Sequence, residues 1–216
     1  MGALIRAALL ALLFAANADV HAAAQSQRGN DNQALVSQVS SRLALMKGVR
    51  AQFVQTQTLA AMKEPLVSKG TLVFLRDRGV IWRMETPYAA TFVITDSGVT
   101  EVDASGKSIR SAGSRGVRGV AQVSKMMRAM LGGDLSALYS QFEVDAQGTA
   151  SDWTLDLKPN QPQLAQAIRG LHMTGGAFVR SLRIDLANGD VTRLEFTKIE
   201  AVDDLPPAER TLLGAP

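Results

Sequence analysis

The sequence predicts an α+β protein whose main element is an antiparallel sheet of short, sequential strands. Apolar residues recur at every second position over segments of strand length, and turn sequences containing glycine join these segments at hairpin spacing. Two stretches with apolar residues at helical spacing, one before the first strand and one in the middle of the chain, add helices. The short connections favour a meander in which successive strands pair.

The chain begins with a segment typical of a secretory signal. One basic residue, Arg6, precedes an apolar run over 7–16, and small residues follow up to Ala24. The run is too short to span a bilayer, so we expect a signal over 1–24, export, and a single domain over 25–216. Because the chain has no cysteine, it cannot carry a lipid-modified cysteine, and we expect a soluble protein.

The first helix and the first strand follow one another directly. Asp31 or Asn32 can cap a helix that runs to about Lys47, where Gly48 ends it. From Val49 the apolar period changes from helical spacing to two, which marks the beginning of a β-region. The apolar face of this helix consists of Leu35, Val36, Val39, Leu43 and Met46.

The remaining strands are marked by alternation between turn signals. They are expected over 66–76, 79–86, 91–96, 98–103 and 107–111, and then over 141–146, 153–158, 178–186 and 191–202. A single helical turn is expected over 164–169. The polar tail after residue 202 contains prolines, so we expect it to end the sheet or to pack loosely across one edge, with Asp203 and Asp204 solvated.

The middle of the chain carries a Gly-rich connection and a methionine stripe. Residues 112–120, AGSRGVRGV, have neither strand nor helix periodicity, so we expect a mobile connection. A helix follows up to Leu131, and Asp134 can cap a further short helix through Tyr139. Methionine is flexible and polarizable, so the stripe is either core packing or the inner surface of a lid over a cavity. It consists of Met126, Met127 and Met130.

Charge is unevenly distributed along a chain of net charge +3. Between residues 107 and 128 there are six basic residues and no acidic one. This basic stretch is either a solvated loop and helix face or a contact for anionic headgroups or an acidic partner. We expect no nucleic-acid partner, because an exported protein is separated from cellular nucleic acids and no aromatic residues interleave with these charges.

Catalytic and metal-binding residue sets are missing from the sequence. The predicted mature chain has one histidine, His172, and no cysteine, so a histidine-based nucleophile pair would have to use His172. There is no G-x-S-x-G, H-E-x-x-H or Walker motif, and no calcium-loop spacing of carboxylates. We therefore expect neither an enzyme nor a bound metal or cofactor.

The hairpin over 66–87, LVSKGTLVFLRDRGVIWRMETP, presents one apolar face that Arg76 interrupts near the turn. An ordinary hairpin over a core and the floor of an apolar cavity both explain this pattern. The apolar face consists of Leu72, Phe74, Val80, Trp82 and Met84.

Three motifs around this hairpin resemble those of the LolA family, the periplasmic outer-membrane lipoprotein carriers. They are F-x-Q at 53–55, K-x-P-L-x-S-x-G at 63–70 and W-R-M-x-x-P at 82–87. The resemblance implies a curved, unclosed antiparallel β-barrel, or half-barrel, whose concave apolar face is covered by helices. It also implies a monomeric periplasmic carrier that takes acylated lipoproteins from an inner-membrane ABC exporter of the LolCDE type and passes them to a LolB-like outer-membrane acceptor.

The same resemblance implies roles for single residues. Arg76 corresponds to the arginine that latches the lid by hydrogen bonds to helix backbone. Asp77 replaces the usual proline and Val80 a bulkier aromatic residue, which implies a different turn and a roomier cavity. The expected cavity lining consists of Phe53, Leu72, Phe74, Val80, Trp82, Met84, Met126, Met127 and Met130.

Two other functions fit the same pattern. One is transport of another lipid or of a lipid-linked product of a dedicated biosynthetic pathway. The other is an interaction domain that senses lipoproteins without delivering them, although such sensors usually carry a second domain or an anchor.

Overall fold

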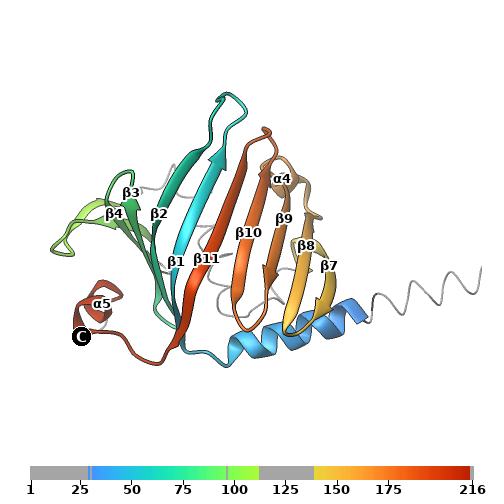
Figure 1. Ribbon diagram of the computed structural model, residues 1–216, viewed down its shortest axis with the longest axis horizontal. Helices are drawn as coiled ribbons and strands as arrows, with labels where there is room; N and C mark the ends of the chain where they lie inside the picture. The colour runs from blue at the N-terminus through green and yellow to red at the C-terminus, as the bar shows by residue number, and fades with distance from the viewer. Residues whose placement is uncertain (1–28, 30, 96, 112–138, 215–216) are drawn as a thin grey trace, which may run out of the picture.

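Eleven strands form one antiparallel sheet in the computed structural model, which describes residues 29, 31–95, 97–111 and 139–214. The strand order is β6-β5-β4-β3-β2-β1-β11-β10-β9-β8-β7, and the two edges, β6 and β7, do not close on each other (Figure 1). The fold is therefore the curved, unclosed antiparallel half-barrel that the sequence resemblance implied. The expected signal, the Gly-rich connection and the methionine stripe lie outside the described residues.

Each strand that alternation predicted is present. The first half of the sheet contains β1 (Gly48–Thr58), β2 (Leu66–Leu75), β3 (Gly79–Thr86), β4 (Ala90–Thr95), β5 (Gly98–Val102) and β6 (Ser108–Ser111). The second half contains β7 (Phe142–Thr149), β8 (Asp152–Pro159), β9 (Ile168–Gly175), β10 (Val179–Leu186) and β11 (Val191–Val202). The first and last strands, β1 and β11, pair with each other in the middle of the sheet and join the two halves (Figure 1).

Strand β9 was missed, and the helical turn expected over 164–169 was wrong in position. The short helix α4 spans Pro162–Ala165, and β9 begins at Ile168. Only Leu171 and Met173 alternate between glycine, histidine and threonine in this strand, so its apolar signal is weak.

The glycine at the end of β9 is required by packing. A Cβ atom on Gly175 would lie 2.1 Å from Cζ2 of Trp153, whose ring covers that position from β8. Trp153 is 1% exposed, and its Nε1 donates a hydrogen bond of 2.9 Å to the carbonyl of Gly176. The buried indole thus fixes the end of β9 against β8.

The main core lies on the concave face of the sheet. Alternate residues of β1–β4 and β7–β11 form one buried cluster, and Val36, Val39 and Leu43 of the N-terminal helix, residues 31–44, belong to it. This helix runs along the ends of the strands of the second half (Figure 1). The sequence prediction of an amphipathic first helix is confirmed.

The C-terminal tail ends the sheet, which was one of the two expected outcomes, but it packs on the convex face and not loosely across an edge. It forms the helix α5 (Pro207–Leu212), and Leu205 and Leu213 are buried in a second apolar cluster. The rest of that cluster comes from the convex side of neighbouring strands. These residues are Val73, Ile81, Val93 and Val102. Asp203 and Asp204 are solvated as expected, with 89% and 70% of their side chains exposed, and Asp204 also forms an ion pair of 3.2 Å with Arg210.

A charged triad fixes α5 to the sheet. Glu209 is 8% exposed and accepts hydrogen bonds of 3.1 and 2.7 Å from Arg50 of β1 and one of 2.9 Å from Arg83 of β3. Burial alone would raise the pKa of the Glu209 carboxyl, but the hydrogen bonds and positive charges of both arginines outweigh it. The pKa of Glu209 therefore lies below its ordinary value.

We expect Glu209→Gln to lower the free energy of unfolding at neutral pH by about 1–3 kcal/mol, because both guanidinium groups lose their counter-charge. The folded pKa of Glu209 lies below the unfolded one, so its stabilisation is lost as the pH falls through the folded pKa. Wild type should therefore lose more stability on acidification than Glu209→Gln. Urea unfolding at neutral and acidic pH measures both effects.

Glu200→Gln is the matched control for this prediction. Glu200 lies 3.7 Å from Nε of the same Arg50, but its side chain is 63% exposed. Exposed ion pairs contribute about 0–1 kcal/mol, so this variant should unfold almost like wild type. Equal acid sensitivity of wild type and Glu209→Gln would show that the triad contributes nothing to stability.

Candidate functional site

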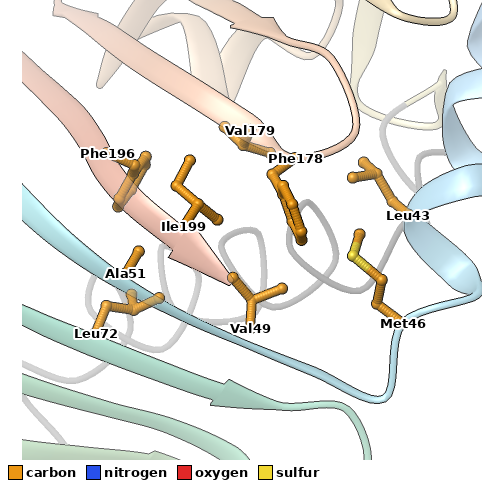
Figure 2. A pocket seen from close by; sticks show the side chains of 9 residues that line it. All are labelled: Leu43, Met46, Val49, Ala51, Leu72, Phe178, Val179, Phe196 and Ile199. Atoms are coloured by element: carbon orange, nitrogen blue, oxygen red, sulfur yellow. The ribbon is translucent and has the colours of Figure 1, made fainter. Parts of the chain in front are cut away.

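A small apolar pocket lies on the concave face where the N-terminal helix ends. Its volume is about 10 Å³, about the least space that can hold one water molecule, so the lining side chains nearly fill the pocket. The lining comes from the helix end, from β1, β2 and β11, and from the turn into β10, as Figure 2 shows. The lining residues are Leu43, Met46, Val49, Ala51, Leu72, Phe178, Val179, Phe196 and Ile199.

Arg76 holds the helix end that lines this pocket. Its Nη2 donates to the backbone carbonyls of Leu43 at 3.0 Å and Met46 at 2.9 Å, and its Nε donates to Met46 at 3.2 Å. The last carbonyls of a helix have no partner within the helix and carry partial negative charge, so a guanidinium group fits there. Arg76 thus forms hydrogen bonds with the backbone of two residues whose side chains line the pocket.

The turn that presents Arg76 needs no proline. The backbone N–H of Arg76 donates to the carbonyl of Lys47 at 2.8 Å, and that of Arg78 donates to Leu75 at 3.1 Å. Asp77, which replaces the usual proline, is exposed between them. Backbone hydrogen bonds therefore orient Arg76 toward the helix.

The six described residues of the expected cavity lining all belong to the concave cluster, but only one of them lines the pocket of Figure 2. Leu72 contributes to both. Val80, expected to leave a roomier cavity, is 0% exposed in the cluster. The other four are Phe53, Phe74, Trp82 and Met84.

Two aromatic rings from β1 and β3 meet across β2, the strand between them. Phe53 on β1 and Trp82 on β3 have ring centroids 4.0 Å apart at an interplanar angle of 34°, although β2 runs between their strands. Gly70 of β2 pairs with Phe53, and the backbone of Arg83 and Met84 on β3 approaches Gly70 so closely that no Cβ atom fits there. The three sequence motifs thus meet at one point of the sheet.

A β-bulge turns Ile199 into the pocket. The register of β11 against β1 shifts between Arg50 and Gln52, and Lys198, at the extra position, has a φ of 48°. Phe196 is buried, so strict alternation would point Lys198 inward and Ile199 outward. The bulge reverses this, because Ile199 lines the pocket and Lys198 is exposed. Alternation could not have identified Ile199.

His172 is paired with a carboxylate on the convex face. Its Nδ1 lies 2.5 Å from Oδ1 of Asp156, and the two face each other across β8 and β9. Within the part of the chain that the structure describes, no group of three or more histidine and acidic side chains could hold a metal ion. Among the same residues, no helix is long and apolar enough to cross a membrane.

Comparison with known families identifies the chain. The family described as outer membrane lipoprotein carrier protein LolA-like matches residues 28–201. The chain belongs to this family. The match spans most of the sequence, including every motif from which the resemblance was drawn, and no curated protein matches the chain.

Solved structures similar to this LolA-like chain share little sequence with it. A LolA superfamily protein from Nitrosomonas europaea is 10% identical, with a TM-score of 0.44 over 81% of this chain and 94% of that one. The MucA/MucB complex of Pseudomonas aeruginosa is 14% identical, with a TM-score of 0.47 over 84% of this chain and 60% of that one. The lipoprotein LppX of Mycobacterium tuberculosis is 12% identical, with a TM-score of 0.37 over 81% of this chain and 100% of that one.

We expect Gly70→Ala to lower the free energy of unfolding by about 1–3 kcal/mol, because overpacking forces the backbone apart. The new Cβ would lie 1.8 Å from the carbonyl oxygen of Arg83 on β3. Urea unfolding measures the loss, and near-ultraviolet circular dichroism reports on the Phe53–Trp82 pair. Gly170→Ala is the control, because its Cβ would approach no closer than 3.5 Å to the nearest atom. Equal stability of both variants would contradict the close approach at Gly70.

Proposed function

We propose that the protein is a periplasmic carrier that shields the acyl chains of lipoproteins in its concave apolar face and ferries them from the inner to the outer membrane. Its partners are an inner-membrane ABC exporter of the LolCDE type and a LolB-like acceptor. The carrier acts as a soluble monomer after removal of a signal over 1–24. It needs no cofactor and catalyses no reaction.

The contact of Arg76 with the helix end carries this proposal. A small hydrophobic pocket by itself is typical of any protein core. Here, however, the side chain of Arg76 binds the backbone of the helix end that forms one wall of the pocket. The latch binds the backbone at Leu43 and Met46, the helix residues that line the pocket. Opening the wall requires breaking these bonds and no strand pairing, so the helix end can move while the sheet stays intact.

The energies make such a latch suitable for a carrier. A hydrogen bond to a charged group contributes about 1.5–3 kcal/mol, and burying a methylene gains about 0.8 kcal/mol. The latch consists of three such bonds, so roughly six to eleven buried methylenes offset its loss, and a long acyl chain exceeds it. The latch favours the closed, empty state without preventing uptake, so it lowers the affinity for cargo and promotes handover.

The proposal predicts that the purified protein releases a newly matured lipoprotein from inner-membrane vesicles into solution as a soluble complex. Burial of the acyl chains removes the cost of exposing them to water, so the complex should stay in the supernatant after the vesicles are sedimented. Vesicles without added carrier are the control. Lipoprotein that remains in the vesicles at all carrier concentrations would exclude this function.

Two other functions remain candidates for the same apolar face. Transport of another lipid or of a lipid-linked pathway product predicts a non-protein ligand in mass spectra of the purified protein. A sensing domain predicts that the protein binds lipoprotein but never transfers it to an acceptor membrane. Both outcomes differ from that expected for the proposed carrier, which binds acylated protein and passes it on.

We expect Arg76→Leu to take up lipoprotein but to transfer it to acceptor membranes poorly, at least several-fold more slowly than wild type. Loss of the latch removes the free energy that favours the closed, empty state, so cargo binds more tightly. A transfer assay between vesicle populations measures the rate.

Arg78→Leu is the matched control for the latch. Arg78 lies two residues away in the same turn and is exposed, so its loss changes the charge equally without touching the helix. Arg76→Lys tests the geometry, because an ammonium group cannot reproduce the planar fork of the guanidinium. Transfer by Arg76→Leu at the rate of Arg78→Leu would remove Arg76 from the mechanism.

A further inference from the structure

The Phe53–Trp82 pair lies where an occupant of the pocket would have to advance. The pocket is lined on β1 by Val49 and Ala51, and Phe53 is the next residue on the same face of that strand. Two residues of a strand span about 6.5–7 Å, so the ring lies one such step beyond Ala51. Phe196, another lining residue, pairs with Phe53 from β11.

The rings close the space on this side. Trp82 pairs with the lining residue Leu72, and the centroid of its ring lies 4.0 Å from that of the Phe53 ring. Phe53 is 1% and Trp82 7% exposed, so both rings are packed and do not line an open cavity. An acyl chain laid along β1 from the helix end would fill the widened pocket and then meet the edge of this pair.

We propose that the Phe53–Trp82 pair sets the length of acyl chain that the site accepts, so that the carrier favours chains ending at the rings over longer ones. This inference rests on the proposed function, since it assumes that acyl chains enter the pocket. Moving the helix end can widen the pocket at its mouth. The ring pair belongs to the sheet, where displacement disrupts packing on three strands, so it resists further advance.

Chain-length dependence of binding gives the test. Below the limit, each added methylene should raise the affinity about fourfold, which corresponds to about 0.8 kcal/mol per buried methylene. Beyond the limit, further methylenes stay outside and the affinity should become constant. The probes are synthetic peptides acylated with saturated chains from hexanoyl to stearoyl, titrated against the intact protein by calorimetry.

Two variants should move the plateau in opposite directions. Phe53→Leu keeps an apolar side chain but removes one ring, so the plateau should begin at longer chains. Ala51→Leu narrows the pocket one step before the rings, so the plateau should begin at shorter chains. Phe142→Leu is the control: Phe142 is 2% exposed in the same cluster but lies on the edge strand β7. It should leave the plateau unchanged.

The outcomes separate this inference from the carrier proposal. A wild-type protein that binds none of the acylated peptides overturns both. Binding with no plateau, with a plateau that Phe53→Leu leaves in place, or with an equal shift in Phe142→Leu overturns the length limit and leaves the carrier function standing. Circular dichroism of each variant establishes that it is folded. If Phe53→Leu does not fold, Trp82→Phe, which replaces the other ring of the pair, is tested in its place.

Discussion

The pairing of β1 with β11 is the constraint on which the rest of the molecule depends. These strands are the first and the last of the sheet in sequence, yet they are neighbours at its centre. Each half of the sheet is a meander of local hairpins, and only this long-range pairing joins them. Its loop-closure entropy is compensated by the concave cluster, which draws residues from both halves and from the N-terminal helix.

The same central strands serve both faces. On the concave side, β1 and β11 line the pocket through Val49, Ala51, Phe196 and Ile199. On the convex side, Arg50 of β1 binds Glu209 of α5. A substitution on the concave or the convex face therefore affects strands that also pack on the opposite face. Arg76 follows the end of β2, which pairs with β1, and its hydrogen bond to the carbonyl of Leu43 connects the N-terminal helix to these central strands.

The sequence predicted the parts of the fold that depend on local periodicity. The first helix and all strands of both meanders except β9 follow from spacing alone, and the family motifs indicated the half-barrel and the contact between Arg76 and a helix backbone. What it missed depends on contacts between distant residues. Strand β9 depends on Trp153 packing over Gly175, and the tail helix α5 is too short to show periodicity.

The pocket was the least predictable part, for a physical reason. Phe178 lies in a turn, where alternation carries no information, and the bulge at Lys198 inverts the inward and outward positions that follow it. The Phe53–Trp82 contact spans two strands, so neither residue predicts the other without the register. Sequence patterns identified the apolar face, but three-dimensional packing decides which part of it is hollow.

The central place of β11 also governs when the chain can fold. Strand β1 has one of its two neighbours only after the segment up to Val202 is available, and α5, which follows, completes the convex face. A chain that stops before β11 would therefore expose one edge of β1 and one edge of β10. The sheet can therefore be completed only once β11 has been made, whichever half forms its hairpins first.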